Sequence, residues 1–466
     1  MSKRYFLDPF GCAKNQVDAE NMMAFLGAAG WTACADALDA DLIIVNSCGF
    51  IEDAKRESIN AVLSWRSLYP EKKILLAGCL PRRYPVELAE ELSEADGFFG
   101  GADLSLIAEA ASASLPGKTE AGRKKARPEK RASGETGFEQ AGRAGERPLL
   151  GFPGQAYVKI SEGCDNHCSF CAIPLIRGPL CSRSISDVTA ECKTLLGRGV
   201  KELCLIGQDL SSYRPAEGAG LRELAAEIAR IDGDFWLRFL YLHPDHFPLD
   251  LLPLMRKDSR FLPYFDIPFQ HGSPSVLKAM RRRGSGESYL ELLNRIRDAL
   301  PDAVIRSTFL TGFPGETEED FGMLVDFQQK ALFDWLGVFV YSREEATPAY
   351  SMKQRVGKKT AERRKAFVEE TQIPITEKRM ERFVGRRMEV LVEECLDPPA
   401  KDPSDPSGAS SVSGLYLGRL FCQAPEVDGA AVIHSGAAVL EAGDLVPCRT
   451  LRRAGFDLEV EPDGLS

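Results

Sequence analysis

The chain reads Glu162-Gly163-Cys164-Asp165-Asn166-His167-Cys168-Ser169-Phe170-Cys171 directly after a short apolar segment, 156–161. That segment is the first of six predicted strands, and the other five are 202–206, 236–242, 264–267, 305–310 and 336–341. Helical patterns lie between the strands, for example at 221–231 and 289–300, and a longer helix is predicted over 361–382. Six strand–helix units indicate an open, partial (β/α)6 barrel, whose active site would lie at the carboxyl ends of the strands.

Three cysteines of this stretch, Cys164, Cys168 and Cys171, have the spacing C-x3-C-x2-C. Three thiolates can bind three irons of a four-iron cluster and leave the fourth iron open to a substrate. Gly163 allows the backbone to turn tightly around such a cluster. The alternative is a structural zinc site, which needs a fourth Cys or His at knuckle spacing. Because Cys181 is not part of a C-x2-C pair, we favour the iron–sulfur cluster.

A second group of cysteines follows the predicted strands of the N-terminal region. Strands over 4–8, 41–46 and 73–77 alternate with helices over 18–26, 51–65 and 86–92, which indicates a parallel α/β sheet. Cys12, Cys48 and Cys79 each come two to four residues after a strand. The carboxyl ends of parallel strands share one edge of a sheet, so we expect these three cysteines to converge there.

Composition changes divide the chain into four predicted parts. Residues 1–115 form the N-terminal domain, 116–150 a charged, Gly-rich linker, 151–383 the barrel and 384–460 a small antiparallel β-barrel. The strands expected in that last barrel are 388–393, 416–421, 431–434 and 445–450, with a Pro/Ser/Asp-rich loop at 397–414.

Length, charge and cysteine content narrow the class of protein. The chain has 466 residues, a net charge of -10 and 13 cysteines, and no apolar run long enough to cross a membrane. Charged residues at the start do not fit a signal peptide, so we expect a cytoplasmic protein whose thiols stay reduced. We expect six isolated cysteines to be packing residues: Cys34, Cys192, Cys204, Cys395, Cys422 and Cys448.

The arrangement of these parts resembles the radical S-adenosylmethionine methylthiotransferases, in which the terminal barrel is a TRAM domain. The resemblance implies two 4Fe-4S clusters, one held by Cys164, Cys168 and Cys171 and an auxiliary one held by Cys12, Cys48 and Cys79. It also implies two uses of S-adenosylmethionine, one as a methyl donor to cluster sulfur and one as a source of the radical that removes hydrogen from the target carbon. Such a carbon is not acidic, and radical chemistry is delegated to cofactors.

Further cofactor-binding residues are expected by the same resemblance. Arg177 and Arg183 follow the cysteine loop and could pair with the carboxylate of S-adenosylmethionine, although both could also be surface charges. Gln208 follows the second barrel strand, and Gly312 and Gly315 belong to a Gly-Phe-Pro-Gly-Glu-Thr loop. In that loop Glu316 could instead cap the next helix, and His271 is an exposed loop residue as readily as a functional one. No residue is assigned a catalytic role.

Local motifs point to the ribosomal branch of the family, the RimO type, whose target is an aspartate β-carbon in small-subunit ribosomal protein twelve. Residues 12–18 (Cys-Ala-Lys-Asn-Gln-Val-Asp) resemble that branch's Cys-Pro-Lys-Asn-x-Val-Asp, with Ala13 in place of proline. Residues 48–51 (Cys-Gly-Phe-Ile) and 424–429 (Ala-Pro-Glu-Val-Asp-Gly) also resemble it. An acidic terminal barrel suits a basic ribosomal protein better than an RNA backbone.

The expected partners follow from this resemblance. They are the ribosomal protein or the subunit carrying it, an electron donor such as flavodoxin or ferredoxin, and a sulfur donor, with no membrane and a monomeric chain. Two alternatives stay open. One is a methylthiotransferase acting on tRNA adenosine near the anticodon, and the other is a non-catalytic RNA-binding scaffold that uses metal only for folding.

Overall fold

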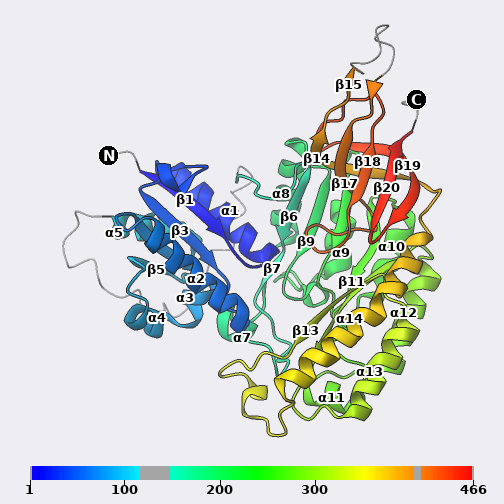
Figure 1. Cartoon of the computed structure of the whole chain (residues 1–466), viewed down its shortest axis with the longest axis horizontal. Coiled ribbons are helices and arrows are strands. Elements are labelled where there is room, and N and C mark those ends of the chain that lie inside the picture. The colour runs from blue at the N-terminus through cyan, green and yellow to red at the C-terminus, as the bar shows by residue number, and fades with distance from the viewer. Residues whose placement is uncertain (1–2, 116–146, 402–410, 464–466) are drawn as a thin grey trace.

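The computed structural model describes residues 3–115, 147–401 and 411–463. Three folded units follow one another along the chain: an N-terminal sheet domain, an open barrel and a small closed barrel (Figure 1). Most of the predicted linker lies outside the described residues, although Arg147 at its end is buried. Within these ranges, none of the helices is long and apolar enough to cross a membrane.

The N-terminal domain is a five-stranded parallel sheet with helices on both faces. The strands β1 (Arg4–Pro9), β2 (Thr32–Ala33), β3 (Leu42–Ser47), β4 (Lys73–Gly78) and β5 (Gly97–Phe99) have the order β2-β1-β3-β4-β5. The helices are α1 (Ala13–Ala28), α2 (Glu52–Leu68), α3 (Cys79–Arg83), α4 (Pro85–Glu91) and α5 (Ile107–Ser114). Along β3, Leu42 and Ile44 enter one core while Ile43 and Val45 enter another. Burial on both faces explains why this strand is a continuous apolar run.

The central unit confirms the six predicted strands. They are β6 (Gln155–Lys159), β9 (Glu202–Ile206), β10 (Trp236–Phe239), β11 (Phe261–Asp266), β12 (Val304–Thr311) and β13 (Trp335–Val340). The sheet is parallel and open, in the order β13-β12-β11-β10-β9-β6. A short hairpin, β7 (Ser161–Glu162) with β8 (Cys181–Ser182), follows β6 and pairs Glu162 with Cys181.

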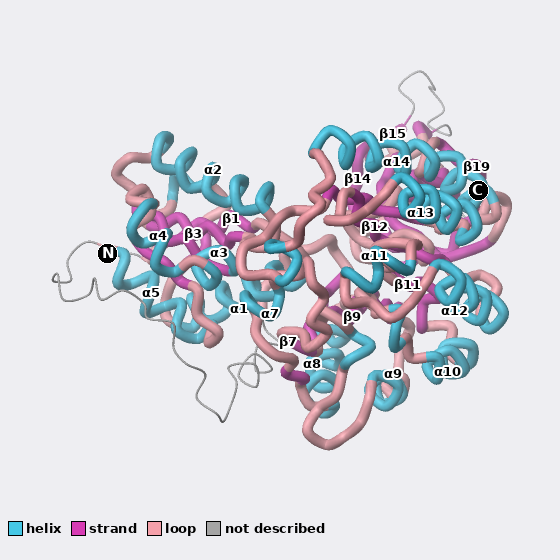
Figure 2. Tube along the Cα trace, turned by 90° about the horizontal axis from the view of Figure 1, so that it is seen from below, coloured by secondary structure: helices cyan, strands magenta, loops and turns pink. Residues whose placement is uncertain are grey.

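Helices cover the outer face of the barrel strands (Figure 2). They are α8 (Ile185–Gly197), α9 (Leu221–Ile228), α10 (Leu252–Lys257), α11 (Pro274–Ala279), α12 (Gly286–Ala299), α13 (Glu318–Ala331) and α14 (Lys358–Glu381). The short helix α7 (Ile173–Ile176) instead contacts α3 of the N-terminal domain. Alternate strand residues, such as Leu203 and Leu205 of β9, pack outward against these helices. The residues that alternate with them, Cys204 and Ile206, face the interior with Tyr157.

The C-terminal unit is a closed five-stranded barrel. Its strands β14 (Arg387–Asp397), β17 (Leu415–Leu420), β18 (Ala431–His434), β19 (Leu445–Ala454) and β20 (Asp457–Pro462) have the order β14-β17-β18-β20-β19. The prediction of a small barrel is confirmed, with two differences: β20 was not predicted, and it pairs with β18 in parallel, so the barrel is not wholly antiparallel. Strands β15 (Ala400–Lys401) and β16 (Ser411–Val412) flank the part of the predicted loop outside the described residues.

The two flanking domains contact opposite ends of the open barrel. First residues of the barrel strands, such as Trp236 and Trp335, share a core with Val390 and Leu420 of the small barrel. At the other end, the loop after β13 contacts the N-terminal domain, where Glu344 accepts hydrogen bonds from Lys55 (3.1 Å) and Arg83 (2.7 Å). The N-terminal domain therefore lies at the carboxyl ends of the barrel strands, where a parallel barrel binds its ligands.

Candidate active site

The three N-terminal cysteines are brought together at the carboxyl edge of their sheet. Cys12 directly precedes α1, Cys48 follows β3, and Cys79 begins α3 directly after β4. Burial, followed by the charges of Cys79 and Cys12, raises the pKa of the Cys48 thiol to about 12. Cys12 also acts on the pKa of Cys79, so the three thiols lie within electrostatic reach of one another. Their role as ligands of one cluster stays a prediction.

Asn15 holds this edge of the sheet in place. Its side-chain Nδ2 donates to the carbonyl oxygen of Ser47 (3.0 Å), and its own carbonyl accepts from Asn46 Nδ2 (2.9 Å). Its Oδ1 accepts a hydrogen bond from the Cys79 thiol at 3.2 Å. One side chain thus joins the loop after β1 to the loops after β3 and β4. Sequence analysis did not single out Asn15, although its place three residues after Cys12 was a usable signal.

Arg177, expected to face the carboxylate of S-adenosylmethionine, instead contacts the N-terminal cysteines. Its Nη2 donates to Cys79 Sγ (3.0 Å) and to Asn15 Oδ1 (2.6 Å). Its Nη1 donates to Asp18 (2.6 Å) and to Glu162 (2.8 Å). The physical reason is that α7 carries the chain from the barrel's cysteine loop back against α3. Arg177 therefore links Cys79 to Glu162, which directly precedes the barrel's cysteine loop.

A buried ionic cluster surrounds Arg177. Lys159, the last residue of β6, pairs with Asp18 and, at 2.8 Å, with Glu162. Burial acts to raise the pKa of Glu162, but the charges of Arg177 and Lys159 outweigh it and hold that pKa well below its ordinary value. Sequence analysis missed these residues because charged side chains are normally read as surface groups.

The second group of cysteines lies on a tight loop after β6 and β7. Cys164 N donates to the Gly178 carbonyl (3.2 Å) and Cys171 N donates to the Cys168 carbonyl (3.1 Å). Gly163 has φ +74°, and a Cβ there would overlap the carbonyl of Pro179, so only glycine fits. Burial, followed by the charges of Cys168 and Cys164, raises the pKa of Cys171 to about 12. The loop thus gathers three thiols, as its spacing predicted.

Both groups of cysteines suit a cluster with several irons. Each group provides three free thiols, the number that a four-iron cluster with one open iron takes from a protein. The hydrogen bond from Arg177 to Cys79 is the kind of contact that tunes cluster sulfur.

Among the other residues predicted to bind a cofactor, Gln208 has a side-chain oxygen that is free to accept a hydrogen bond. Its Oε1 is buried and has no hydrogen-bond partner in the described structure. The adjacent Asp209 accepts from Asn166 of the cysteine loop (2.7 Å) and from His246 Nε2 (2.7 Å). Gln208 therefore lies beside a network anchored to the cysteine loop, and its carbonyl oxygen could accept a hydrogen bond from a cofactor.

Arg183 lies in a different environment from the one expected. Its Nε donates to Asp187 at 2.6 Å, and its Nη1 pairs with Glu191 of α8. Glu191 also pairs with Arg147, which reaches Glu20 of α1 at 2.8 Å. These buried carboxylates occupy the guanidinium, so the structure gives Arg183 a role in holding α1, α8 and β6 together.

The two glycines of the loop after β12 differ in how closely they are packed. A Cβ at Gly312 (φ +76°) would overlap the Ala361 Cβ of α14, whereas a Cβ at Gly315 (φ +89°) would lie 3.7 Å from the Gln354 side chain, an ordinary contact. Glu316 accepts from the backbone N–H of Gly312 (2.5 Å) and of Phe313 (3.0 Å), so it caps its own loop.

His271 is fully buried, contrary to the exposed position considered for it. Its Nδ1 accepts a hydrogen bond from the Ser273 N–H at 3.0 Å. Burial lowers the pKa of its imidazole to about 3, so the ring is neutral at physiological pH.

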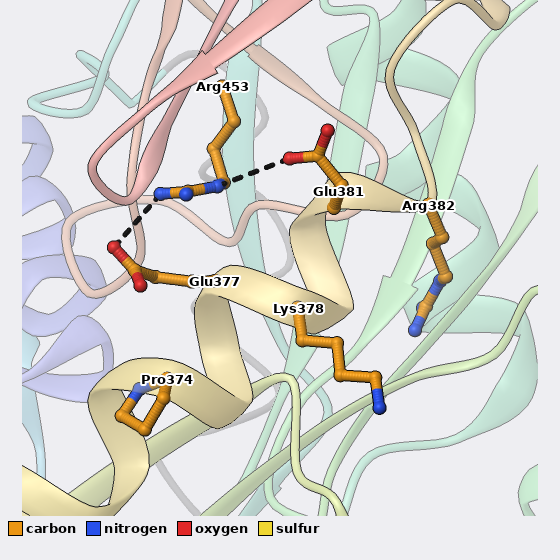
Figure 3. A pocket seen from close by; sticks show the side chains of 6 residues that line it. All are labelled: Pro374, Glu377, Lys378, Glu381, Arg382 and Arg453. Atoms are coloured by element: carbon orange, nitrogen blue, oxygen red, sulfur yellow. Dashed lines mark hydrogen bonds and ion pairs between the residues drawn. The ribbon is translucent and has the colours of Figure 1, made fainter.

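A surface hollow of about 490 Å³ lies between α14 and β19 (Figure 3), away from the two groups of three cysteines. Arg453 bridges Glu377 (3.0 Å) and Glu381 (3.4 Å) across it. Its charged groups are thus partly satisfied by one another, and none of the predicted site residues lines it.

Comparisons with known proteins agree with this architecture. Residues 4–100 match the family described as "Uncharacterized protein family UPF0004", 158–327 match the Radical SAM superfamily and 384–462 match the TRAM domain. The chain is 46% identical to the ribosomal protein uS12 methylthiotransferase RimO of Treponema denticola, over 97% of this chain and 99% of that protein. The chain belongs to the RimO family of methylthiotransferases.

Other RimO proteins show similar agreement. The protein of Acetivibrio thermocellus is 37% identical, with 98% of each chain covered, and that of Thermotoga maritima is 39% identical over 91% of this chain and 92% of its own. Among solved structures, the radical S-adenosylmethionine methyltransferase TsrM from Kitasatospora setae has a TM-score of 0.53 at 17% identity, covering 75% of this chain and 77% of that one. At that identity the likeness supports the fold of the RimO-family chain alone.

Proposed function

We propose that this RimO-family enzyme adds a methylthio group to the β-carbon of an aspartate in ribosomal protein uS12. The observation that carries the proposal is that Arg177, at the carboxyl end of an open barrel, contacts both Cys79 and Glu162, two residues before Cys164. The name shared by the full-length relatives supports uS12 as the substrate.

We assign one 4Fe-4S cluster to Cys164, Cys168 and Cys171 and the auxiliary cluster to Cys12, Cys48 and Cys79. When bound, the two clusters and S-adenosylmethionine supply the one-electron and sulfur-transfer chemistry that side chains cannot perform. Each group provides three thiols to a four-iron cluster, which leaves one iron without a cysteine ligand.

The chain's own residues position these groups. Arg177 donates to Cys79 and orders the auxiliary site, while its contacts with Asp18 and Glu162 fix the N-terminal domain against the barrel. Gln208 Oε1 provides a hydrogen-bond acceptor next to the barrel's cysteine loop. The charged side chains of the ionic cluster are buried at the junction between the two domains, whereas Cys12 is exposed.

The partners and setting follow as part of the proposal. The enzyme takes electrons from a donor such as flavodoxin or ferredoxin and sulfur from a separate donor, and it works as a cytoplasmic monomer. The folded parts divide near residues 115, 150 and 383.

An anaerobic assay tests the proposed substrate. The assay contains reconstituted enzyme, reductant, sulfide and S-adenosylmethionine, with either a uS12 loop peptide or a tRNA anticodon stem-loop as the substrate. The masses of the products are measured by mass spectrometry. The proposal requires one added methylthio group on the peptide alone. Modification of the RNA alone would retain the chemistry and reject the protein substrate.

A further inference from the structure

One lysine of the N-terminal domain enters the end of the barrel. Lys14 lies two residues after Cys12 at the start of α1, and only 8% of it is exposed. Its Nζ is 3.2 Å from the ring centroid of Tyr241, which follows β10. Its charge also acts on Cys12. Lys14 therefore places an ammonium group between the N-terminal cysteines and the carboxyl ends of the barrel strands.

Several other buried cations of the barrel are in ion pairs, although Arg282, which acts on Cys171, is in none within the described residues. Lys159 pairs with Asp18 and Glu162, Arg238 pairs with Glu202 at 2.7 Å, and Arg306 pairs with Asp428 at 2.7 Å. Within the described residues, Lys14 is in no ion pair. Its ammonium lies over the face of the Tyr241 ring. Such a cation–π contact offsets about 2 kcal/mol or more of the cost of burying a charge. The charges of Cys12 and Asp266 also act on Lys14, but its ammonium has no carboxylate in direct contact within the described residues.

The backbone of Tyr241 is held in an unusual conformation to make this contact. Its φ is +66°, in the left-handed region that a bulky residue rarely adopts. Its N–H donates to Asp266 Oδ2 at 3.2 Å, which fixes the turn after β10. Such strain persists only where the surroundings impose it, and it is concentrated at functional sites. The strained turn places an aromatic platform directly under the Lys14 ammonium.

We propose that Lys14 binds the carboxylate of the substrate aspartate and thereby selects an aspartate over a nucleoside. This inference rests on the proposed function. The β-carbon of aspartate is bonded directly to the carboxylate carbon, so an ammonium that binds the carboxylate also fixes the reacting carbon close to Cys12. A charge-assisted hydrogen bond supplies the direct carboxylate contact that Lys14 lacks within the described residues. An adenosine offers no carboxylate for this contact.

The test measures binding to the reconstituted holoenzyme without reductant, so that no turnover occurs. Two fluorescent uS12 loop peptides are compared by anisotropy, one with the target aspartate and one with asparagine in its place. The wild type should bind the aspartate peptide about 10- to 100-fold more tightly. Lys14→Met should bind both peptides equally, and Lys14→Arg, which keeps the charge, should retain part of the preference. Lys193→Met, a change at an exposed lysine of α8, is the matched control.

Several outcomes overturn the inference. A wild type without preference between the two peptides rejects it with no variant needed, and so does a Lys14→Met enzyme that keeps the preference. Loss of the auxiliary cluster's iron and visible absorbance in Lys14→Met, with the preference unchanged in Lys14→Gln, would show that Lys14 only balances cluster charge. If the wild type modifies the anticodon stem-loop and neither peptide, the proposed function itself fails. Modification of the aspartate peptide with no dependence on Lys14 rejects only this inference.

Discussion

Arg177 Nη2 lies 3.0 Å from Cys79 Sγ, although the two residues belong to different domains and to different groups of cysteines. The same guanidinium reaches Glu162, two residues before Cys164, at 2.8 Å. Any change at this side chain therefore acts on Cys79, on the segment before Cys164 and on the contact between the two domains.

Substitution of Arg177 should destabilise the whole junction. Arg177→Met leaves Asp18 and Glu162 buried with one positive partner fewer, and breaking a buried pair costs about 3–5 kcal/mol. Denaturant unfolding of the reconstituted enzyme measures this loss. The matched control is Arg230→Met, because the Arg230 side chain is 76% exposed and pairs only with Glu227. That change should stay within about 0.5 kcal/mol. Equal stability of the two variants would contradict the role given to Arg177.

Gly312 should not tolerate a side chain. Gly312→Ala introduces a Cβ that overlaps Ala361 and imposes a positive φ on alanine, so we expect a loss of about 1–3 kcal/mol. Gly322→Ala, inside α13, meets no atom within 4 Å and should instead stabilise the helix by up to about 1 kcal/mol. Thermal unfolding of both variants checks the prediction. We expect Gly312→Ala to lower the free energy of unfolding and Gly322→Ala to raise it. An unchanged stability of Gly312→Ala would show that α14 can move away from the loop.

Acid should weaken the contact between the central and terminal barrels through Glu202. Burial acts to raise its pKa, but the charges of Arg419 and Arg238 outweigh burial and hold the pKa at about 2. A lowered folded-state pKa contributes stability above the unfolded value of about 4.3, here about 3 kcal/mol. This contribution is lost as the pH falls from about 5 toward 2.

The free energy of unfolding, measured from pH 7 to pH 2.5, tests this prediction. Glu202→Gln should be less stable at pH 7 and should lose less stability on acidification. Glu389→Gln, at an exposed position of β14, should follow the wild type. Parallel pH profiles for wild type and Glu202→Gln would exclude the proposed linkage.

Much of the fold could be predicted because the barrel strands are short apolar runs separated by helices. The pairing of β18 with β20 could not, because alternation along a strand such as 457–462 indicates which residues are buried but not the direction of the neighbouring strand. Cysteine spacing predicts six cluster ligands, since their positions after strands place each group at one edge of its sheet, and this assignment stays a prediction.

The charged residues of the site were the least predictable part. Lys14 and Arg177 are of residue types that normally lie on the surface. They are buried because the N-terminal domain docks on the barrel. Arg183 was expected near a cofactor, but two carboxylates of α8 on successive turns hold it. The role of a buried charged residue depends on which distant segments of the chain pack together. The residue pattern within one segment does not specify this packing.

The most direct test of the account is the iron content of the anaerobically reconstituted enzyme and of two triple variants. The wild type should hold about eight irons, and about four should remain when either Cys12, Cys48 and Cys79 or Cys164, Cys168 and Cys171 are replaced by alanine. Replacement of Cys34, Cys395 and Cys448 is the matched control and should leave about eight. An unchanged iron content in either cluster variant, or zinc in place of iron, would contradict the assignment of two clusters to these six cysteines.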